Sequence, residues 1–187
     1  MLTKLASITT FDLTHGPYFV GSYVTKNLAQ QFHTVDWQPS DVDIICRTEE
    51  QMFHLKDKFL PIAGYYNEKE REVVSQMFGV HPLHMIWVID GITVTASIRD
   101  HTAMEQVKTA DYTVTAAASD GMIYLATAQT LADIKDNVLR KLSFDMNRLC
   151  VGTEATAWVL EKYTSYINRG FIDKDNLILK ELNTLVA

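Results

Sequence analysis

The sequence predicts an α+β fold, in which a small mixed β-sheet with flanking helices is followed by a short helical C-terminal part. Three observations lead to this prediction. Strand-like runs of β-branched and aromatic residues fall in the first two thirds of the 187 residues, helical periodicity dominates the remainder, and 47% of the residues are hydrophobic, which is enough for a sizeable core. We expect residues 1–128 to form an α/β head and residues 129–187 to pack on it as a helical segment.

The first expected elements are a strand, a tight turn and a helix. Tyr18–Val20 is a short β-branched and aromatic run, and Gly21-Ser22 follows it directly. Behind this turn, apolar side chains recur every four residues, which places them on one face of a helix. They are Val24, Leu28 and Phe32.

The next expected strand carries two carboxylates. After a polar loop through residues 36–40, Asp41 and Asp43 alternate with apolar neighbours in a run that ends at Cys46. Because successive side chains of a strand point to opposite faces, both carboxylates are expected to leave the same face of the sheet.

Two helices are expected after this strand. Thr48 with Gln51 and Asn67 with Glu70 resemble capping boxes, in which a side-chain oxygen accepts an amide proton three residues on. Pro61 is expected to end the first helix. Apolar residues at helical spacing follow each cap: Met52, Leu55 and Phe59 in the first helix, and Val73, Val74, Met77 and Phe78 in the second.

Four further strands are expected in two pairs. Asp90-Gly91, a dipeptide that tolerates the positive φ angles of a tight hairpin turn, separates the first pair. Residues 119–121 separate the second pair. The strand-like runs are Met85–Ile89, Ile92–Ile98, Tyr112–Ala116 and Met122–Ala126.

Helical periodicity takes over behind the last strand. We expect Thr130 to cap one helix, Gly170 to close a second, and a third to occupy the C-terminus. The residues within these helices include Leu131, Ile134, Val138, Leu139 and Leu142, then Ala155, Trp158, Val159, Lys162, Tyr163 and Tyr166, and finally Leu177, Ile178, Leu182 and Leu185.

Charge and cysteine content limit the classes of function. With 17 Lys and Arg against 23 Asp and Glu, the formal net charge is -6, which argues against a broad nucleic-acid surface. Cys46 and Cys150 are too few for a disulfide framework and are expected to be inert core thiols in a reducing cytoplasm. No apolar run approaches the roughly 20 residues of a membrane helix, so we expect no membrane association.

The most informative constellation combines the Asp41 and Asp43 pair with the Gly21-Ser22 turn. Two carboxylates on one strand face can share Mg²⁺, and a glycine turn at a helix N-terminus points free amides at an anion. Together they predict a place for a nucleoside triphosphate and for metal-assisted nucleotidyl transfer. Taken alone, an Asp-x-Asp pair is also typical of a solvated edge strand or a loop-end Asx turn.

These residues resemble a known family. Val20-Gly21-Ser22 and Asp41-Val42-Asp43 are similar to the apolar-Gly-[Gly/Ser] and Asp-x-Asp pattern of polymerase-β-like nucleotidyltransferases. Residues 91–99, which end in Arg99, resemble the next core strand in the heads of CCA-adding enzymes and bacterial poly(A) polymerases. Residues 111–117 resemble the Asp-Phe-Thr-x-Asn-Ala segment of the same group, and an Asp-Ile-Lys helix follows at residues 133–135.

The resemblance implies a nucleotidyltransferase-like head with Mg²⁺ as cofactor and Mn²⁺ as its substitute. It implies a transfer of a nucleoside monophosphate from an NTP, such as ATP, to a hydroxyl acceptor on RNA, a protein or a small molecule. The implied roles are catalysis and metal binding for Asp41 and Asp43, and nucleotide binding for Gly21, Ser22, Arg99 and Asp111.

Departures from the family pattern support an alternative function. Residues 93–95 read Thr-Val-Thr where many members carry a third carboxylate, so the alternative is a catalytically silent module that senses a nucleotide or binds a protein. Thr109 and Ala110 replace paired arginines, and Thr115 replaces an asparagine, which leaves the nucleotide unspecified. The long helical body that holds tRNA in CCA-adding enzymes does not fit after residue 140, so we do not expect classical tRNA-end repair.

Other residues have structural explanations that we prefer. His81 and His84 suggest a zinc or copper site, but no cluster at ligand spacing completes it. Ser22 lacks the flanking glycine and the base that a nucleophile needs, so phosphate contact suits it better. Aromatic side chains at helical spacing usually pack in the core rather than stack on a base; they include Trp158, Tyr163 and Tyr166.

Overall fold

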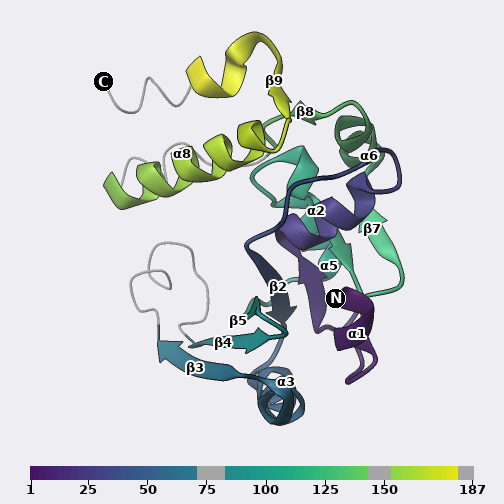
Figure 1. Cartoon of the computed structure of the whole chain (residues 1–187), viewed down its shortest axis with the longest axis vertical. Helices are drawn as coiled ribbons and strands as arrows, with labels where there is room; N and C mark the ends of the chain where they lie inside the picture. The colour runs from purple at the N-terminus through teal and green to yellow at the C-terminus, as the bar shows by residue number, and fades with distance from the viewer. Residues whose placement is uncertain (71–82, 143–152, 181–187) are drawn as a thin grey trace.

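A mixed β-sheet organises the computed structural model of the chain, which describes residues 1–70, 83–142 and 153–180 (Figure 1). The strands of this sheet are β1 (Tyr18–Val20), β2 (Asp41–Cys46), β3 (Tyr65–Glu70), β4 (Leu83–Ile89), β5 (Ile92–Ile98), β6 (Ala117–Ser119) and β7 (Tyr124–Ala126). Their order across the sheet is β3-β4-β5-β2-β1-β6-β7. β2 and β5 run parallel, and the other neighbouring strands run antiparallel.

Helices flank this sheet, which confirms the predicted α+β class. The α-helices are α1 (Leu2–Ala6), α2 (Gly21–Ala29), α3 (Glu49–Phe59), α5 (Ala103–Lys108), α6 (Ala128–Lys135) and α8 (Thr153–Asn168). Short 3₁₀ turns are η1 (Leu60–Ile62), η2 (Thr113–Thr115) and η3 (Lys174–Asn176), and β8 (Val138–Leu139) pairs with β9 (Ile172–Asp173). Among the helices that the structure describes, none combines the length and the apolar character needed to cross a bilayer.

The two faces of the sheet bury different side chains. Val42, Ile44 and Cys46 of β2 belong to the larger core, which also contains buried residues of α2 and α3. Ile45 points the other way, into a smaller cluster with Val107 of α5. Because β2 alternates, Asp41 and Asp43 lie on the face opposite the larger core, where they are only partly buried.

Local turn signals predicted several boundaries correctly. Asp90 and Gly91 connect β4 to β5 with φ angles of 52° and 77°, which confirms the tight hairpin. Thr48 caps α3 by accepting the Gln51 amide at 3.2 Å. Gly170, with φ 88°, follows the C-terminal end of α8, as expected for a helix-closing glycine.

The prediction of a helix that begins at Asn67 is wrong for the residues that the structure describes. Asn67 and Glu70 belong to β3, which pairs antiparallel with β4 and sets Asn67 opposite Ile86. The aromatic pair Tyr65-Tyr66 favours a strand, and pairing with β4 satisfies the backbone more completely than an isolated helix turn would. The rest of the predicted helix, and His81, lie outside the described residues.

The strand expected over Tyr112–Ala116 is also wrong. Thr113–Thr115 form η2, and the strand begins only at Ala117. The Thr115 hydroxyl donates to the Tyr112 carbonyl at 2.9 Å, a local bond that competes with strand pairing.

The helix expected behind Thr130 starts earlier and ends sooner. Thr127 is the N-cap of α6, and its hydroxyl accepts the Thr130 amide at 3.0 Å. Asn137 then takes a φ of 53°, which ends the helix, so that Val138 and Leu139 form β8. Of the last predicted helix, residues 177–180 are helical, whereas Leu182 and Leu185 lie outside the described residues, as does Cys150.

Asp133 ties α6 to the segments on either side of it. The residue is only 3% exposed, and its carboxylate accepts hydrogen bonds from Thr113 Oγ1 at 2.6 Å and from Gln129 Nε2 at 2.8 Å. The Arg140 guanidinium donates to both oxygens, at 3.2 Å and 3.4 Å. One buried and fully bonded carboxylate therefore holds η2, α6 and the chain before residue 141 together.

Asp133→Ala is expected to lower the free energy of unfolding by about 2–4 kcal/mol, because it leaves the Thr113 hydroxyl buried without this acceptor. The exposed Asp136, just past the end of α6, is the matched control, and Asp136→Ala is expected to change stability by less than about 0.5 kcal/mol. Urea unfolding followed by circular dichroism measures both variants. Equal losses in the two variants would contradict the role given to Asp133.

Candidate functional site

The backbone of Gly21 touches the carboxylate of Asp43. A Cβ atom built on Gly21 would lie 2.4 Å from Asp43 Oδ2, closer than any real contact allows. Val20 pairs with Asp43 across β1 and β2, so the first residue of α2 lies directly beside the carboxylate. Gly21 also has a φ of 78°, which only glycine adopts without strain. Glycine is therefore required here both by space and by backbone conformation.

The start of α2 offers free amides at this position. Val20 occupies the N-cap in an extended conformation with no side-chain cap, and the first turn contains no acidic residue. Gly21 and Ser22 are partly buried. The first amides of a helix lack intrahelical partners and carry the positive end of the helix dipole, so this end of α2 favours an anion.

Thr95 is the neighbour of Asp43 on the other side. Thr95 pairs with Asp43 across the parallel strands β2 and β5, and its hydroxyl donates to Asp43 Oδ1 at 2.8 Å. The threonine thus stands where the family resemblance leads one to look for a third carboxylate. Among the residues that the structure describes, no group of three His, Cys, Asp or Glu side chains gathers as a metal site.

The charge of Asp43 is poorly compensated. Burial, followed by the charge of Asp41, raises the pKa of Asp43 from 3.8 to about 6. The hydrogen bond from Thr95 and the positive charges of Lys162 and Arg99 act in the opposite direction. Asp41 has a hydrogen bond of its own, in which the Ser40 hydroxyl donates at 2.8 Å. The pair therefore holds two neighbouring negative charges that an added cation would stabilise.

Helix α8 brings a lysine to the same region. Lys162 Nζ lies 2.5 Å from Asp111 Oδ2, and both side chains are about one third exposed or less, at 30% and 26%. The charge of Lys162 also acts on Asp43. Figure 1 shows α8 lying across the end of the sheet at which β2 begins. Asp111 is therefore connected to the carboxylate pair through Lys162.

Arg99 lies at the other end of the same sheet face. Its amide donates to the Cys46 carbonyl at 2.8 Å, which continues the ladder of β2 and β5 and sets Arg99 beside Arg47. Arg99 lies four positions after Thr95, or about 13 Å along the strand. The structure thus brings Gly21, Asp41 and Asp43 together with Ser22 adjacent. The backbone of Arg99 lies farther along β5, although its charge still acts on Asp43.

Lys162 is the site residue that sequence reasoning missed. Its place in the helical periodicity indicates only that it belongs to a helix. A signal was present, because Lys162 lies four residues before Tyr166, and a lysine on the inward face of a helix requires a partner. Its carboxylate partner, Asp111, is 51 residues away in sequence, so pairing could not be read locally.

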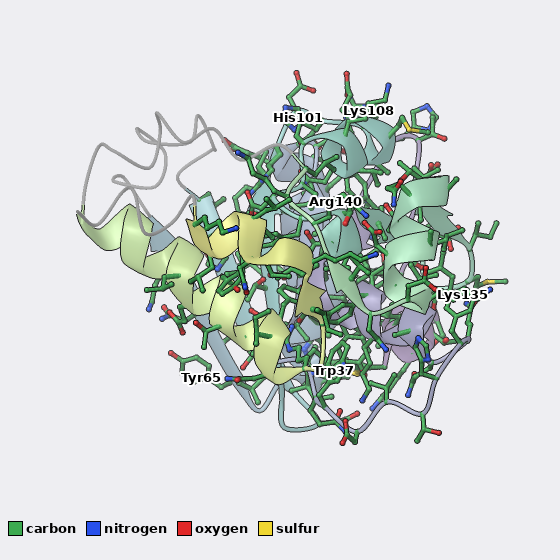
Figure 2. The ribbon with its side chains drawn as sticks, turned by 90° about the horizontal axis from the view of Figure 1, so that it is seen from above. Trp37, Tyr65, His101, Lys108, Lys135 and Arg140 are labelled. Carbon is green, nitrogen blue, oxygen red and sulfur yellow. The ribbon has the colours of Figure 1, made fainter. Side chains whose placement is uncertain are left out.

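The aromatic residues of α8 whose side chains are described pack in the core. Tyr163 is 8% and Tyr166 2% exposed, and the Tyr166 ring contacts Tyr112 and Phe171, which confirms the structural interpretation for these two. Trp37 instead stacks on the Arg169 guanidinium, 4.9 Å from its ring centre, beside the end of α8 (Figure 2). A cavity of about 720 Å³ adjoins this pair, and none of the predicted site residues line it.

Several solved structures contain a fold similar to this one, whereas no family model and no curated protein matches the chain. A tRNA nucleotidyltransferase complexed with a primer tRNA and an incoming ATP analogue is 18% identical, with a TM-score of 0.50 over 83% of this chain and 43% of that chain. A tRNA-processing enzyme in an apo form is 20% identical, with a TM-score of 0.50 over 84% of this chain and 39% of that one.

A Thermotoga maritima CCA-adding enzyme complexed with tRNA matches with 15% identity and a TM-score of 0.48, over 67% of this chain and 28% of that chain. The two better-matched structures show that the chain has a nucleotidyltransferase-like fold. The chain spans only about two fifths of the length of those two proteins, 43% and 39%.

Gly21→Ala is expected to cost about 2 kcal/mol more stability than Gly91→Ala, because the two glycines share a left-handed φ but only Gly21 faces a carboxylate. A Cβ atom on Gly91 would meet nothing within 4 Å, and its φ is 77°, so this control isolates the backbone strain. Urea unfolding measures both costs. The excess should vanish in an Asp43→Ala background, and equal costs for both glycines in the parent chain would contradict the contact.

Asp43 is expected to make the metal-free protein less stable as the pH rises from about 4 to about 6, because in this range the folded state retains a proton that the unfolded chain has lost. Asp43→Asn removes this dependence, so the variant gains about 1–3 kcal/mol relative to the parent by pH 7. Urea unfolding between pH 4 and pH 8 with a chelator measures it. A difference that does not vary with pH would refute the raised pKa.

Proposed function

We propose that this chain is a Mg²⁺-dependent nucleotidyltransferase that moves a nucleoside monophosphate from an NTP to a hydroxyl acceptor and releases pyrophosphate. One observation carries the proposal: the contact between the Gly21 backbone and the Asp43 carboxylate. It sets the amide-rich end of α2 beside a pair of carboxylates. A metal-bound triphosphate needs these two chemistries next to each other, one for the phosphates and one for the cation.

The carboxylate pair suits Mg²⁺. Asp41 and Asp43 share one strand face, and burial, followed by the charge of Asp41, raises the pKa of Asp43. An added cation would stabilise both ionised carboxylates. These two residues would hold the ion, and two protein ligands leave coordination positions for phosphate oxygens and water. When bound, Mg²⁺ neutralises charge that develops on the phosphates during transfer. The Thr95 hydrogen bond keeps the Asp43 carboxylate in a single orientation.

The phosphates would be held by the chain itself. The first amides of α2 point at the space next to Asp43, and the Ser22 hydroxyl adds a donor at the same turn. Lys162 supplies a positive charge from α8, and Asp111 positions that lysine through their ion pair. We therefore assign nucleotide contacts to Gly21 and Ser22, with Asp111 at the border of the site. The backbone of Arg99 lies farther along β5, but its charge acts on Asp43, so Arg99 stays a candidate contact at the edge of the nucleotide site.

A nucleoside triphosphate is supported as the donor by one solved neighbour of the same fold, which was captured with an incoming ATP analogue. That neighbour also carries a primer tRNA, but it is more than twice as long as the matched region, so its acceptor is not transferred to this chain. The acceptor is a hydroxyl on RNA, on a protein or on a small molecule.

A specific observation favours a second function, a catalytically silent module that senses a nucleotide or binds a protein. Thr95 occupies the strand position beside Asp43 and donates a hydrogen bond, whereas a third carboxylate would add a metal ligand. Two carboxylates hold a divalent ion less tightly than three do. A silent module would bind a nucleotide, if it binds one, in a manner that does not depend on the metal.

Isothermal titration of each NTP with and without Mg²⁺ is the test of the proposed function. We expect Mg²⁺-dependent binding to the parent chain that weakens about tenfold or more in Asp41→Asn and Asp43→Asn, because each removes one charged metal ligand. Asp136→Asn is the matched control and should bind as the parent does. Labelled NTP with candidate acceptors then measures transfer.

Each outcome of this titration assigns a function. Metal-dependent binding followed by label transfer supports the enzyme. Binding that Mg²⁺ and both substitutions leave unchanged supports the silent module. No binding of any NTP at millimolar concentration would contradict the enzyme and the nucleotide-sensing module, and would favour the protein-binding form of the silent module.

A further inference from the structure

Arg47 and Arg99 lie side by side at the carboxyl ends of two parallel strands. Cys46 pairs with Ile98 in the ladder of β2 and β5, and the Arg99 amide donates to the Cys46 carbonyl at 2.8 Å. Arg47 and Arg99 are the residues that directly follow this last pair, and the charges of both act on Tyr18. Alternation along the two strands places them on the same sheet face as Asp43. Like charges on neighbouring strand positions repel each other, so this pair costs stability unless an anion lies between the guanidinium groups.

Some hydrogen-bond donors of the two arginines have no acceptor among the described residues. Within the described residues, the buried Nε atoms of Arg47 and Arg99 and the buried Nδ1 of His101 have no hydrogen-bond partner. The remaining contacts are long or solvent-screened: Arg99 reaches the neutral Gln106 at 3.4 Å, and Arg47 reaches the Thr14 carbonyl at 3.4 Å. Buried donors without partners are rare in folded proteins, so a cluster of them favours a ligand that accepts hydrogen bonds.

Carboxylates near the two arginines compensate their charge only in part, although the charges of His101 and Arg47 act on Glu105. Asp100 contacts Arg47 at 3.2 Å, but its side chain is 92% exposed, so water screens the interaction. Glu105 is engaged in the capping box of α5, where it accepts from the amide and the hydroxyl of Thr102 at 2.8 Å. Arg99 has no ion pair with a carboxylate among the described residues.

The surroundings hold the two guanidinium groups in place. The Tyr18 hydroxyl donates to the His101 carbonyl at 2.9 Å, which anchors the segment that follows β5. Tyr18 itself is fully buried, and the charges of both arginines act on it. The Arg47 side chain is 29% exposed, so a ligand from solvent can reach its terminal nitrogens. The cluster is thus both fixed by the fold and open to solvent.

We propose that Arg47 and Arg99, with His101 beside them, form a binding site for a phosphate-type oxyanion at the end of the sheet face opposite the carboxylate pair. A tetrahedral oxyanion accepts forked hydrogen bonds from two guanidinium groups at once, which matches the planar geometry of arginine. The oxyanion is either free in solution, such as phosphate or pyrophosphate, or is a phosphate group carried by a larger molecule. This site is independent of the proposed function, since it needs neither Mg²⁺ nor a nucleotide.

The site differs from a phosphate site at the start of α2. Arg99 lies four positions after Thr95, which corresponds to about 13 Å of backbone along β5. The charge of its guanidinium group nevertheless acts on Asp43, so the arginine cluster borders the carboxylate pair along this face. The same sheet face therefore carries carboxylates at the start of β2 and arginines at its end. A molecule that lies along this face meets both charges.

The test is isothermal titration of the full chain with inorganic phosphate, pyrophosphate and glycerol phosphate in metal-free buffer. We expect the dissociation constant to rise about tenfold or more in Arg47→Gln and Arg99→Gln, because each loses a charge-assisted forked bond. Arg47→Lys and Arg99→Lys keep the charge but lose the fork, and they replace the glutamine variants if those do not fold. Lys108→Gln is the matched control, an exposed cation of α5 near His101 in Figure 2, and should leave binding unchanged.

The three probes distinguish the source of the anion. Tighter binding of phosphate or pyrophosphate than of glycerol phosphate supports a free oxyanion, and equal or tighter binding of glycerol phosphate supports a phosphate on a larger molecule. Failure of the parent chain to bind any probe overturns the inference. So does binding that the arginine variants keep, or that Lys108→Gln weakens as much as they do. Loss of binding in Ser22→Ala, with the arginine variants unaffected, would assign the anion to α2 and also overturn it.

Discussion

The close approach of the Gly21 backbone to the Asp43 carboxylate holds the candidate site together. Since a Cβ atom would lie 2.4 Å from Asp43 Oδ2, any other residue at position 21 would displace the Asp43 carboxylate or the start of α2. Glycine allows the helix to begin directly against the strand. The positive end of a helix and a buried carboxylate consequently face the same space, an arrangement that suits a cation and an anion bound together.

The chemistry of the sheet is divided between its two faces. One face of β2 supplies Val42, Ile44 and Cys46 to the larger core and thereby fixes the strand, while the other carries the charged groups. Along β2 and β5 this second face changes from carboxylates at one end to arginines at the other. At the start of β2 the two carboxylates face the uncharged Thr93 and Thr95 of β5, whereas each of the two parallel strands is followed by an arginine at its other end, so the face has a negative and a positive end.

Helix α8, from a distant part of the chain, adds a positive charge beside the carboxylates at the start of β2. Lys162 pairs with Asp111 at 2.5 Å, and its charge also reaches Asp43, so α8 joins the segment before η2 to the carboxylate pair. Thr95 acts on the same carboxylate through a hydrogen bond rather than a charge. The ionisation of Asp43 is therefore set by burial, by the like charge of Asp41, by the hydrogen bond from Thr95 and by the positive charges of Lys162 and Arg99.

Features that depend on neighbouring residues could be predicted from the amino-acid sequence. They are the alternation that puts Asp41 and Asp43 on one face, the Asp90-Gly91 hairpin and the glycine that closes α8. The order of motifs also indicated the resemblance to a nucleotidyltransferase head. Prediction failed where distant pairing overrides local preference, as in β3, whose capping pattern yields to pairing with β4. The bond from Thr95 to Asp43, the pairing of Lys162 with Asp111, and the approach of Arg47 to Arg99 emerged only from the folded chain. The Thr95 and Asp43 pair spans 52 positions of the sequence, and the Lys162 and Asp111 pair spans 51. Periodicity and turn chemistry act within a few residues, whereas contacts between residues this far apart depend on how the core packs.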